Sequence, residues 1–317
     1  MSKTDLLCRA LRYSGLLALA ARVGPRAGAR GLVILAYHRV ADATGSHPVY
    51  DADVVSCTEA EFAREMAFAA RHFDVITFAD LESGLGRFRR PLMVTFDDGY
   101  RDNVDVALPV LDRVGIRAVF FVTTGLIGTG EMPWWDRLAR SVRDTQRTTL
   151  DARPWMEKAL PLGTQCEREA ARLALTARAK DLYNAARLEL VQTIEQRTGL
   201  PGTGGSDRSL MMDWDGVRRL VDAGMEIGSH TQSHPVLGRM DSSADLTREL
   251  VYSRETLERE TGQAVRALAY PVGRRADVST ELIRAVHAAG YRYACLYEHG
   301  VNSRAGFDPL RLLRIKA

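Results

Sequence analysis

Residues 91–100 read PLMVTFDDGY, an apolar run followed by two adjacent carboxylates, Asp97 and Asp98. The apolar run predicts a buried strand, and Gly99 turns the chain where that strand ends. Successive side chains along a strand point to opposite faces of the sheet, but two adjacent Asp residues at a strand end, where the chain turns, can still face the same cavity. Carboxylates at the carboxyl end of a buried strand are typical of α/β active sites. The alternative is an Asp-Asp-Gly turn with no chemistry.

Strands and helices alternate on both sides of this pair. Helices are predicted at residues 103–114, 217–223, 246–260 and 279–289, each followed by a glycine, which takes the left-handed conformation cheaply: Gly115, Gly224, Gly262 and Gly290. An earlier helix, predicted at 56–73 with Thr58 and Glu61 as its capping residues, precedes a short strand predicted at 75–77. Apolar strands follow these helices at residues 117–122, 225–228, 265–270 and 291–296, and an earlier strand is predicted at 31–40. This α/β rhythm predicts parallel strands covered by helices, and the number of units favours a barrel over an open sheet.

One segment, at about residues 131–210, interrupts the rhythm and contains no predicted strand. A helix opens at Trp134, a longer helical stretch covers about 167–198, and residues 201–205 form a glycine-rich linker. We interpret the segment as a helical insertion beside the barrel mouth. It is either a lid or a pad that covers the barrel surface.

Composition excludes some functions and constrains others. The chain has 317 residues, 46% of them apolar and 26% charged, which is ordinary for a soluble globular protein. A formal charge of +3 without a Lys/Arg block gives no reason to expect nucleic-acid binding. The four cysteines lie far apart, which argues against a disulfide framework or a cysteine zinc cluster and fits a reducing compartment.

The first 30 residues combine arginines with a short apolar run and have the outline of a weak signal peptide. The same pattern suits an amphipathic helix, which we favour, with peripheral membrane contact through residues 4–22. This interpretation predicts a cytoplasmic protein, peripheral to the inner membrane or free of it, and export is the alternative. No other segment is long enough to span a membrane.

A second polar cluster, GSHTQSHP at residues 228–235, follows another predicted strand. Imidazole is the commonest protein ligand for zinc and similar metals, and His230 and His234 are four residues apart. Pro235 argues against a helix here, so the pair sits on a loop at a strand's carboxyl end. Two His and one Asp make a three-ligand metal site, which leaves the second Asp available as a base.

Together, the TFDDG motif at 95–99 and the HTQSH motif at 230–234 resemble the polysaccharide deacetylase family, carbohydrate esterases with a NodB homology domain. The resemblance covers about residues 32–315, interrupted by the helical insertion. It implies a distorted (β/α) barrel and a metal-dependent hydrolase. Such an enzyme removes N-acetyl groups from an amino sugar in a polysaccharide, for example an exopolysaccharide, or in its precursor.

The resemblance also implies residue roles. Asp97 would be the general base, and Asp98, His230 and His234 would hold a divalent metal, most often zinc, with cobalt or manganese as alternatives. The metal would polarise the acetyl carbonyl and activate a water molecule. The backbone N–H of Val272, in the turn at 270–273, would bind the oxyanion.

Two departures from the family pattern lead to further predictions. Many members carry an Arg, paired with the catalytic Asp, where this chain has Ala269, and we predict Arg274 as its replacement. Many members also keep a general-acid His near the C-terminus, which this chain lacks. His38, in LAYHRV at 35–40, instead resembles the circularly permuted poly-N-acetylglucosamine deacetylases and is predicted to be the general acid. The alternative is a His hydrogen-bonded beneath the metal site.

Three rival functions remain open. A deacetylase or deformylase of a lipid-linked sugar would fit an N-terminal amphipathic helix at the cytoplasmic membrane face. An inactive carbohydrate-binding relative would not need the intact Asp97, Asp98, His230 and His234. A metal phosphoesterase would want ligands for a second metal, which the sequence does not offer.

Overall fold

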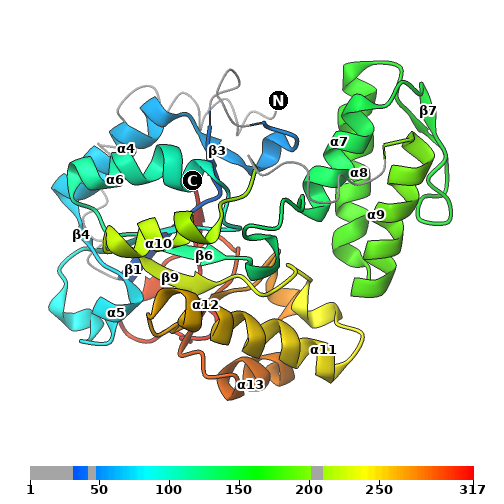
Figure 1. The fold of residues 1–317 in the computed structure, drawn as a ribbon. Helices are drawn as coiled ribbons and strands as arrows, with labels where there is room; N and C mark the ends of the chain where they lie inside the picture. The colour runs from blue at the N-terminus through cyan, green and yellow to red at the C-terminus, as the bar shows by residue number, and fades with distance from the viewer. Residues whose placement is uncertain (1–30, 42–47, 201–209) are drawn as a thin grey trace.

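The computed structural model describes residues 31–41, 48–200 and 210–317 (Figure 1). The helix predicted within residues 1–30, its membrane contact through 4–22 and the linker at 201–205 lie outside the described residues. Within the described ranges, no helix is long and apolar enough to cross a membrane.

A curled, nine-stranded sheet forms the centre of the molecule (Figure 1). Its order is β11 (Tyr293–Cys295), β10 (Ala267–Ala269), β9 (Glu226–Ser229), β6 (Val119–Val122), β5 (Pro91–Phe96), β1 (Gly31–Tyr37) and β12 (Asn302–Ser303). Two further strands lie off this path: β4 (Asp74–Val75) pairs with β5, and β13 (Ile315–Lys316) pairs with β1. Every pair in this sheet is parallel except β1 with β12. Because parallel strands end at one edge, the loops after β1, β5, β9 and β10 open on the same side.

The last residues of the chain connect the two sides of the curled sheet. Leu312 forms a parallel bridge with Cys295 of β11, and its N–H donates to the Ala294 carbonyl at 2.9 Å. Three residues later β13 pairs with β1, with Ile315 opposite Leu35. The segment therefore lies between β11 and β1 and closes the sheet towards a barrel, which confirms the predicted α/β barrel class.

Helices cover the outside of the sheet: α4 (Glu59–His72), α5 (Phe78–Leu81), α6 (Leu108–Val114), α10 (Trp214–Asp222), α12 (Ser253–Thr261) and α13 (Thr280–Ala288). The N-terminus of α4 follows from sequence, because Thr58 and Glu61 form a reciprocal capping box. Its buried side consists of Phe62, Met66 and Ala69, as the spacing predicts.

Three helix and strand boundaries differ from prediction. The helix predicted at 103–114 begins with a π-turn at Asn103–Ala107. The helix predicted at 246–260 begins earlier and has three parts: α11 (Ser243–Thr247), a π-turn at Arg248–Tyr252, and α12. The strand predicted at 75–77 stops at Val75, since Asp80 accepts a hydrogen bond from the Thr77 N–H at 2.9 Å and starts α5 there. Local capping and packing thus override the periodicity.

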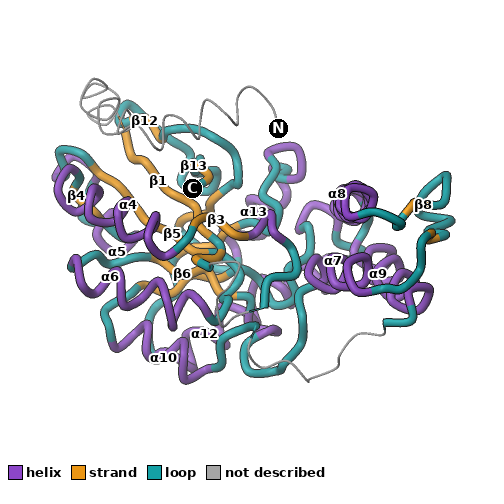
Figure 2. The backbone as a smooth tube through the Cα atoms, turned by 90° about the horizontal axis from the view of Figure 1, so that it is seen from above, coloured by secondary structure: helices purple, strands orange, loops and turns teal. Residues whose placement is uncertain are grey.

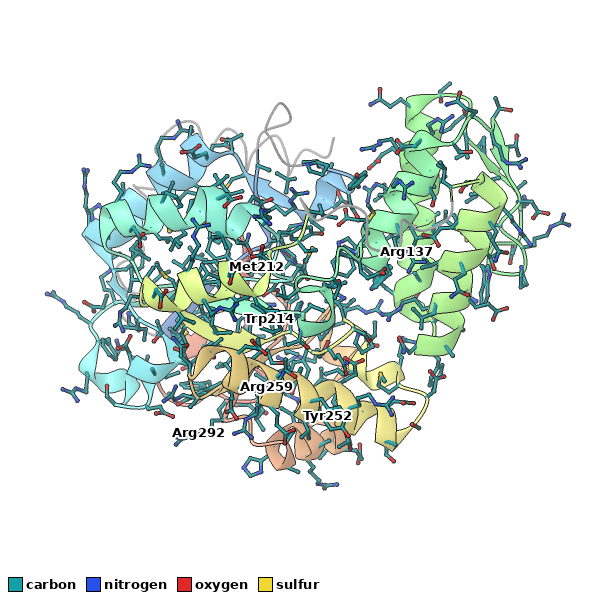
Figure 3. The ribbon with its side chains drawn as sticks, in the orientation of Figure 1. Arg137, Met212, Trp214, Tyr252, Arg259 and Arg292 are labelled. Atoms are coloured by element: carbon teal, nitrogen blue, oxygen red, sulfur yellow. The ribbon has the colours of Figure 1, made fainter. Side chains whose placement is uncertain are left out.

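The interrupting segment forms three helices beside the barrel, α7 (Trp134–Asp144), α8 (Gln165–Asp181) and α9 (Asn184–Thr198), as Figures 1 and 2 show. They share an apolar core that includes Leu138, Leu175 and Leu190. Arg137 of α7, labelled in Figure 3, donates to both carboxylate oxygens of Glu195 on α9, at 2.7 and 2.6 Å.

Two details of this helical segment were not predicted. The helical stretch expected at about 167–198 is divided into two helices, because the chain is extended at Leu182 and Tyr183, neither of which is a sequence signal for a helix end. The segment also contains a short antiparallel pair, β7 (Thr149–Leu150) with β8 (Leu160–Pro161), where no strand was predicted. Strands of two residues are too short to show an alternating pattern.

Candidate active site

The two adjacent carboxylates reach one cavity because of a tight turn after β5. The φ of Asp98 is 76°, and the Gly99 N–H donates to the Asp97 carbonyl at 3.0 Å, which makes a γ-turn centred on Asp98. This turn replaces the side-to-side alternation of a strand. The residue after Asp98 must be a glycine, because its φ is 92° and a Cβ at this position would lie only 3.0 Å from the Cδ1 of Ile127.

Asp98 faces both predicted histidine ligands. Its Oδ1 lies 3.4 Å from Nε2 of His230 and 3.4 Å from Nε2 of His234. The Nδ1 of His230 lies 2.8 Å from the Ala269 carbonyl, so we assign the hydrogen to Nδ1 and a lone pair to Nε2.

These three side chains fit a divalent metal. One donor atom from each lies within 4.8 Å of the others, and Asp98 Oδ1 has no hydrogen-bond partner among the described residues. A buried carboxylate oxygen without a hydrogen-bond partner is costly, and a cation bound between it and the facing imidazole nitrogens would offset that cost. Two nitrogens and one oxygen form the donor set of catalytic zinc and related ions.

The pKa values of the two imidazoles are shifted in opposite directions. For His230, burial would lower the pKa, but the negative charges of Asp97 and Asp98 outweigh it and raise the pKa above its ordinary value. For His234, burial and the neighbouring His230 lower the pKa well below the ordinary value. His234 is therefore neutral near pH 7, the form that binds a metal.

The histidine loop is fixed by its own hydrogen bonds rather than by a helix, as Pro235 indicates. Thr231 Oγ1 accepts from the His234 N–H at 3.1 Å, and Glu249 accepts from the N–H groups of Gln232 and Ser233 at 2.8 Å each. Thr231 and His234 both have positive φ values. The non-glycine residues with positive φ in the described ranges are Asp98, Thr231, His234 and Val272, so the backbone strain is concentrated at this site.

Asp97 is paired with a residue that sequence analysis missed. Arg314, just before β13, donates from Nη1 to Oδ1 at 2.7 Å and from Nη2 to Oδ2 at 2.8 Å, and both side chains are buried. Burial alone would raise the pKa of Asp97, but Arg314 and His230 lower it to about 2. The carboxylate is therefore ionised at neutral pH, which is the form that a general base requires.

The prediction that Arg274 replaces the Arg absent at Ala269 is wrong. Arg274 is half exposed and bonds Asp277 at 2.7 Å and Asp181 at 2.9 Å, away from Asp97. Arg314 lies 217 positions from Asp97 in sequence, and only the closure of the barrel brings it there. The sequence feature that could have indicated Arg314 is its place in the apolar C-terminal segment LRLLRIKA, because an arginine in a buried segment needs a buried acidic partner.

His38 lies between β1 and β2 (Arg39–Val40), with Nε2 3.9 Å from Asp97 Oδ2. Its ring packs edge-on against Tyr297, at 5.2 Å between centroids, and its carbonyl accepts from Asn103 Nδ2 at 2.7 Å. Burial lowers the pKa of His38, and the negative charges of Asp98 and Asp97 partly oppose this. A protonated His38 would therefore give up its proton readily.

Val272 is the central residue of a second γ-turn. Its φ is 63°, a strained value for a β-branched side chain, and the Gly273 N–H donates to the Pro271 carbonyl at 2.7 Å. Tyr270 holds this turn by donating its hydroxyl to the Leu310 carbonyl at 3.0 Å. No hydrogen bond between described residues uses the Val272 N–H, which leaves it free for an oxyanion.

All these groups line one cavity of about 330 Å³, here called the catalytic cavity. Its lining from the barrel includes His38, Asp97, Asp98, His230, His234, Val272, Tyr297 and Arg314. Its other wall comes from the helical segment, through Trp134, Trp135, Thr176 and Lys180. The helices beside the barrel therefore form part of the site, a contribution the sequence did not specify.

Trp135 is held against a metal-ligand candidate by a buried network. Its ring centroid lies 4.3 Å from that of His234, and its Nε1 donates to the Tyr100 hydroxyl at 2.7 Å. That hydroxyl donates to Asp136 Oδ2 at 2.7 Å, and burial raises the pKa of Asp136 to about 7. Tyr100 thus supports the wall of the catalytic cavity from behind.

One cavity thus combines three side chains that fit a metal, a separate ionised carboxylate, a free backbone N–H and an imidazole. With a metal bound, such a set of groups can hydrolyse an amide or ester. The family model described as polysaccharide deacetylase matches residues 87–294, more than half of the chain. The chain belongs to the polysaccharide deacetylase family. That range includes Asp97, Asp98, His230, His234 and Val272 but neither His38 nor Arg314.

Solved structures share the polysaccharide deacetylase fold at low sequence identity. The Streptococcus pyogenes deacetylase PplD, in complex with acetate, is 17% identical with a TM-score of 0.57, covering 90% of this chain and 92% of that one. IcaB from Ammonifex degensii is 18% identical with a TM-score of 0.54, covering 91% and 92%. The BpsB deacetylase domain from Bordetella bronchiseptica is 15% identical with a TM-score of 0.52, covering 91% and 96%. No curated protein matches the sequence significantly.

Proposed function

We propose that this polysaccharide deacetylase is a metal-dependent hydrolase that removes N-acetyl groups from an amino sugar in a polysaccharide or its precursor. One observation carries the proposal: Asp98, His230 and His234 converge within 4.8 Å while Asp97, beside them, is held by Arg314 instead. The adjacent carboxylates are thereby separated into one that binds a metal and one that accepts a proton.

Asp98, His230 and His234 would hold the metal, for which we propose zinc, with cobalt or manganese as alternatives. When bound, a divalent ion supplies Lewis-acid chemistry, polarising the acetyl carbonyl and lowering the pKa of water. His230 is oriented for this by its bond to the Ala269 carbonyl, and His234 by its packing against Trp135.

The remaining groups act on the substrate and the water. Asp97, fixed by Arg314, accepts the proton of the attacking water. The Val272 N–H donates to the acetyl oxygen as negative charge develops on it. His38, on the Asp97 side of the cavity, donates a proton to the leaving amine, so that the C–N bond breaks to give acetate and a free amino sugar.

Acetate release from a panel of substrates tests the proposal. We expect the purified protein to release acetate from at least one N-acetylated glycan, with activity lost to a chelator and restored by zinc, cobalt or manganese. The panel includes oligomers of N-acetylglucosamine and lipid-linked sugars, and formate is measured in parallel to detect deformylation. Chelator-insensitive acetate release would contradict the metal role. Formate release without acetate would favour the deformylase alternative.

The role of His38 has its own test. His38→Ala is expected to lower kcat by about 10²- to 10⁴-fold, because the leaving amine loses its proton donor. Its matched control is His299→Ala, since His299 is exposed and does not line the catalytic cavity. Steady-state kinetics with metal content measured in both variants would decide the matter. Full activity in His38→Ala would remove it from the acid role.

A further inference from the structure

Glu249 is a buried carboxylate, 6% exposed, that lies against the histidine loop (residues 230–234) and has no part in the proposed reaction. Its Oε2 accepts hydrogen bonds from the N–H groups of Gln232 and Ser233 at 2.8 Å each, and its Oε1 accepts from the Ser233 hydroxyl at 2.5 Å. Hydrogen bonds to a carboxylate are about twice as strong as those between neutral groups. Glu249 therefore fixes the middle of the loop, between its two histidines.

Other contacts hold the carbonyl groups of the same loop. The backbone N–H groups of residues 124–125 donate to the carbonyls of residues 231–232, at 3.1 and 2.8 Å. Arg187 of α9 donates from Nη1 to the His234 carbonyl at 2.9 Å. Because these groups are donors, they can bind only the carbonyls. The two amide groups in the middle of the loop depend on Glu249 instead.

The ring of His234 has less support than that of His230. The Nδ1 of His230 is held by the Ala269 carbonyl, whereas the Nδ1 of His234 is buried and has no hydrogen-bond partner among the described residues. Metal-binding imidazoles almost always use this second nitrogen for a bond that sets the ring direction. The direction of the His234 ring therefore depends on its packing against Trp135 and on the backbone of the loop.

That backbone is strained at two positions. The φ values of Thr231 and His234 are 69° and 56°, which non-glycine residues keep only where the surrounding structure enforces them. Without the bonds to Glu249, the loop could relax towards ordinary φ values. The Nε2 of His234 would then leave its position 3.4 Å from Asp98 Oδ1.

A π-turn at Arg248–Tyr252, between α11 and α12 in Figure 1, places Glu249 beside the loop. Such turns within α-helices are frequent at functional sites. Buried hydroxyls satisfy two carbonyls of this turn. Ser253 donates to the Glu249 carbonyl at 2.6 Å, and Tyr291 donates to the Leu250 carbonyl at 2.8 Å.

The same hydroxyls connect the π-turn to the start of the histidine loop. Ser253 Oγ lies 2.9 Å from Ser229 Oγ, which accepts from the Thr231 N–H at 3.1 Å. Since Ser253 donates its hydrogen to the Glu249 carbonyl, we assign Ser229 as the donor to Ser253. Ser229 and Ser253 are both fully buried. The π-turn and the histidine loop are thus one hydrogen-bonded unit.

We propose that Glu249 is a positioning residue of the metal site, which holds the histidine loop in the conformation that directs His230 and His234 at Asp98. The proposal rests on the proposed function for the role of these three side chains as metal ligands. Residues that orient metal ligands typically contribute about 10- to 100-fold to metal affinity. Glu249 differs from the usual orienting partner, because it acts on the loop backbone and not on an imidazole nitrogen.

Zinc affinity measures this role without depending on turnover. The metal-free full chain is titrated with zinc at pH 7 in competition with a chromophoric chelator. Glu249→Met removes all three bonds at similar side-chain size and is expected to weaken zinc binding by about 10- to 100-fold. Glu249→Gln should show a smaller loss, below about tenfold, because its amide oxygen can accept from both N–H groups while its NH₂ group donates to Ser233.

Melting temperatures with and without zinc separate positioning from a purely structural role. A structural role would lower both temperatures equally, whereas positioning makes the zinc-induced rise smaller in Glu249→Met than in wild type. Glu226→Met is the matched control. Glu226 is also a buried glutamate that accepts a backbone N–H, from Ala79 at 3.0 Å, but it lies at the opposite end of β9. This control should keep the zinc affinity of wild type.

Ser233→Ala keeps the test decisive if Glu249→Met does not fold. Ser233 is exposed, and the change removes one of the three bonds to Glu249, so zinc binding should weaken by about two- to tenfold. Its control is Ser83→Ala, which removes an exposed hydroxyl that donates to the Asp80 carbonyl at 2.7 Å. Zinc affinity should not change in the control.

The outcomes separate this inference from the proposed function. Wild-type zinc affinity in Glu249→Met, or in Ser233→Ala where Glu249→Met does not fold, would overturn the positioning role, and so would an equal loss in Glu226→Met. If wild type still binds zinc and releases acetate, only the role of Glu249 is then wrong. Weaker zinc binding in Glu249→Met, with no acetate release by wild type from any glycan, would support the positioning role and overturn the deacetylase function.

Discussion

Asp97→Asn is expected to lower kcat by about 10²- to 10⁴-fold while the protein still binds about one divalent metal per chain. The amide cannot accept the water's proton, but Asp98, His230 and His234 remain in place to hold the metal. Substrate affinity should be retained, so that the loss lies in kcat. Acetate-release kinetics and elemental analysis of the same preparation measure both quantities.

The adjacent position provides the control for this experiment. Asp98→Asn should lose metal and activity together, since Asp98 Oδ1 is the carboxylate oxygen that faces both imidazoles. Asp97→Asn also leaves Arg314 with a buried charge and no counter-ion, so a lower melting temperature is expected in that variant as well. Loss of metal from Asp97→Asn with retention in Asp98→Asn would show that the two roles are reversed.

Arg314→Met is expected to reduce both stability and activity. It leaves the buried Asp97 without its bidentate partner, and breaking a buried pair in this way costs about 3–5 kcal/mol of unfolding free energy. Activity should fall because Asp97 loses the two hydrogen bonds that orient its carboxylate. Denaturant unfolding at pH 7 and the pH dependence of kcat measure the two effects.

The pH dependence has a definite sign. Arg314 and His230 lower the pKa of Asp97 to about 2, from an ordinary value of 3.8. The stabilisation is therefore full above about pH 4 and is lost as the pH falls towards 2. In Arg314→Met the pKa of Asp97 rises, so the acid limb of the activity profile should move to higher pH.

Arg274→Met is the matched control for Arg314→Met. Arg274 also bonds two carboxylates, but it is half exposed, and water screens such pairs. We expect a change of about 1 kcal/mol or less and an unaltered pH profile. Equal stability losses in the two variants, or an acid limb that does not move in Arg314→Met, would contradict the role assigned to Arg314.

Much of the candidate site could be predicted because its residues lie in short local motifs. Asp97 and Asp98 are adjacent, His230 and His234 are four apart, and each motif follows an apolar strand. Since parallel strands end at one edge of the sheet, motifs from different strands must meet there. His38 could be placed at the same edge for this reason, although its role rests on a family resemblance.

The sequence by itself determined the α/β alternation, the barrel class and the four residues Asp97, Asp98, His230 and His234. The tertiary structure alone decided two features: the Arg314–Asp97 pair and the wall formed by Trp135. Each joins segments distant in sequence, through barrel closure or through packing of α7 and α9 against the histidine loop. Periodicity and spacing describe how one segment folds. They do not describe which distant side chain neutralises a buried charge, because that depends on how the complete chain packs.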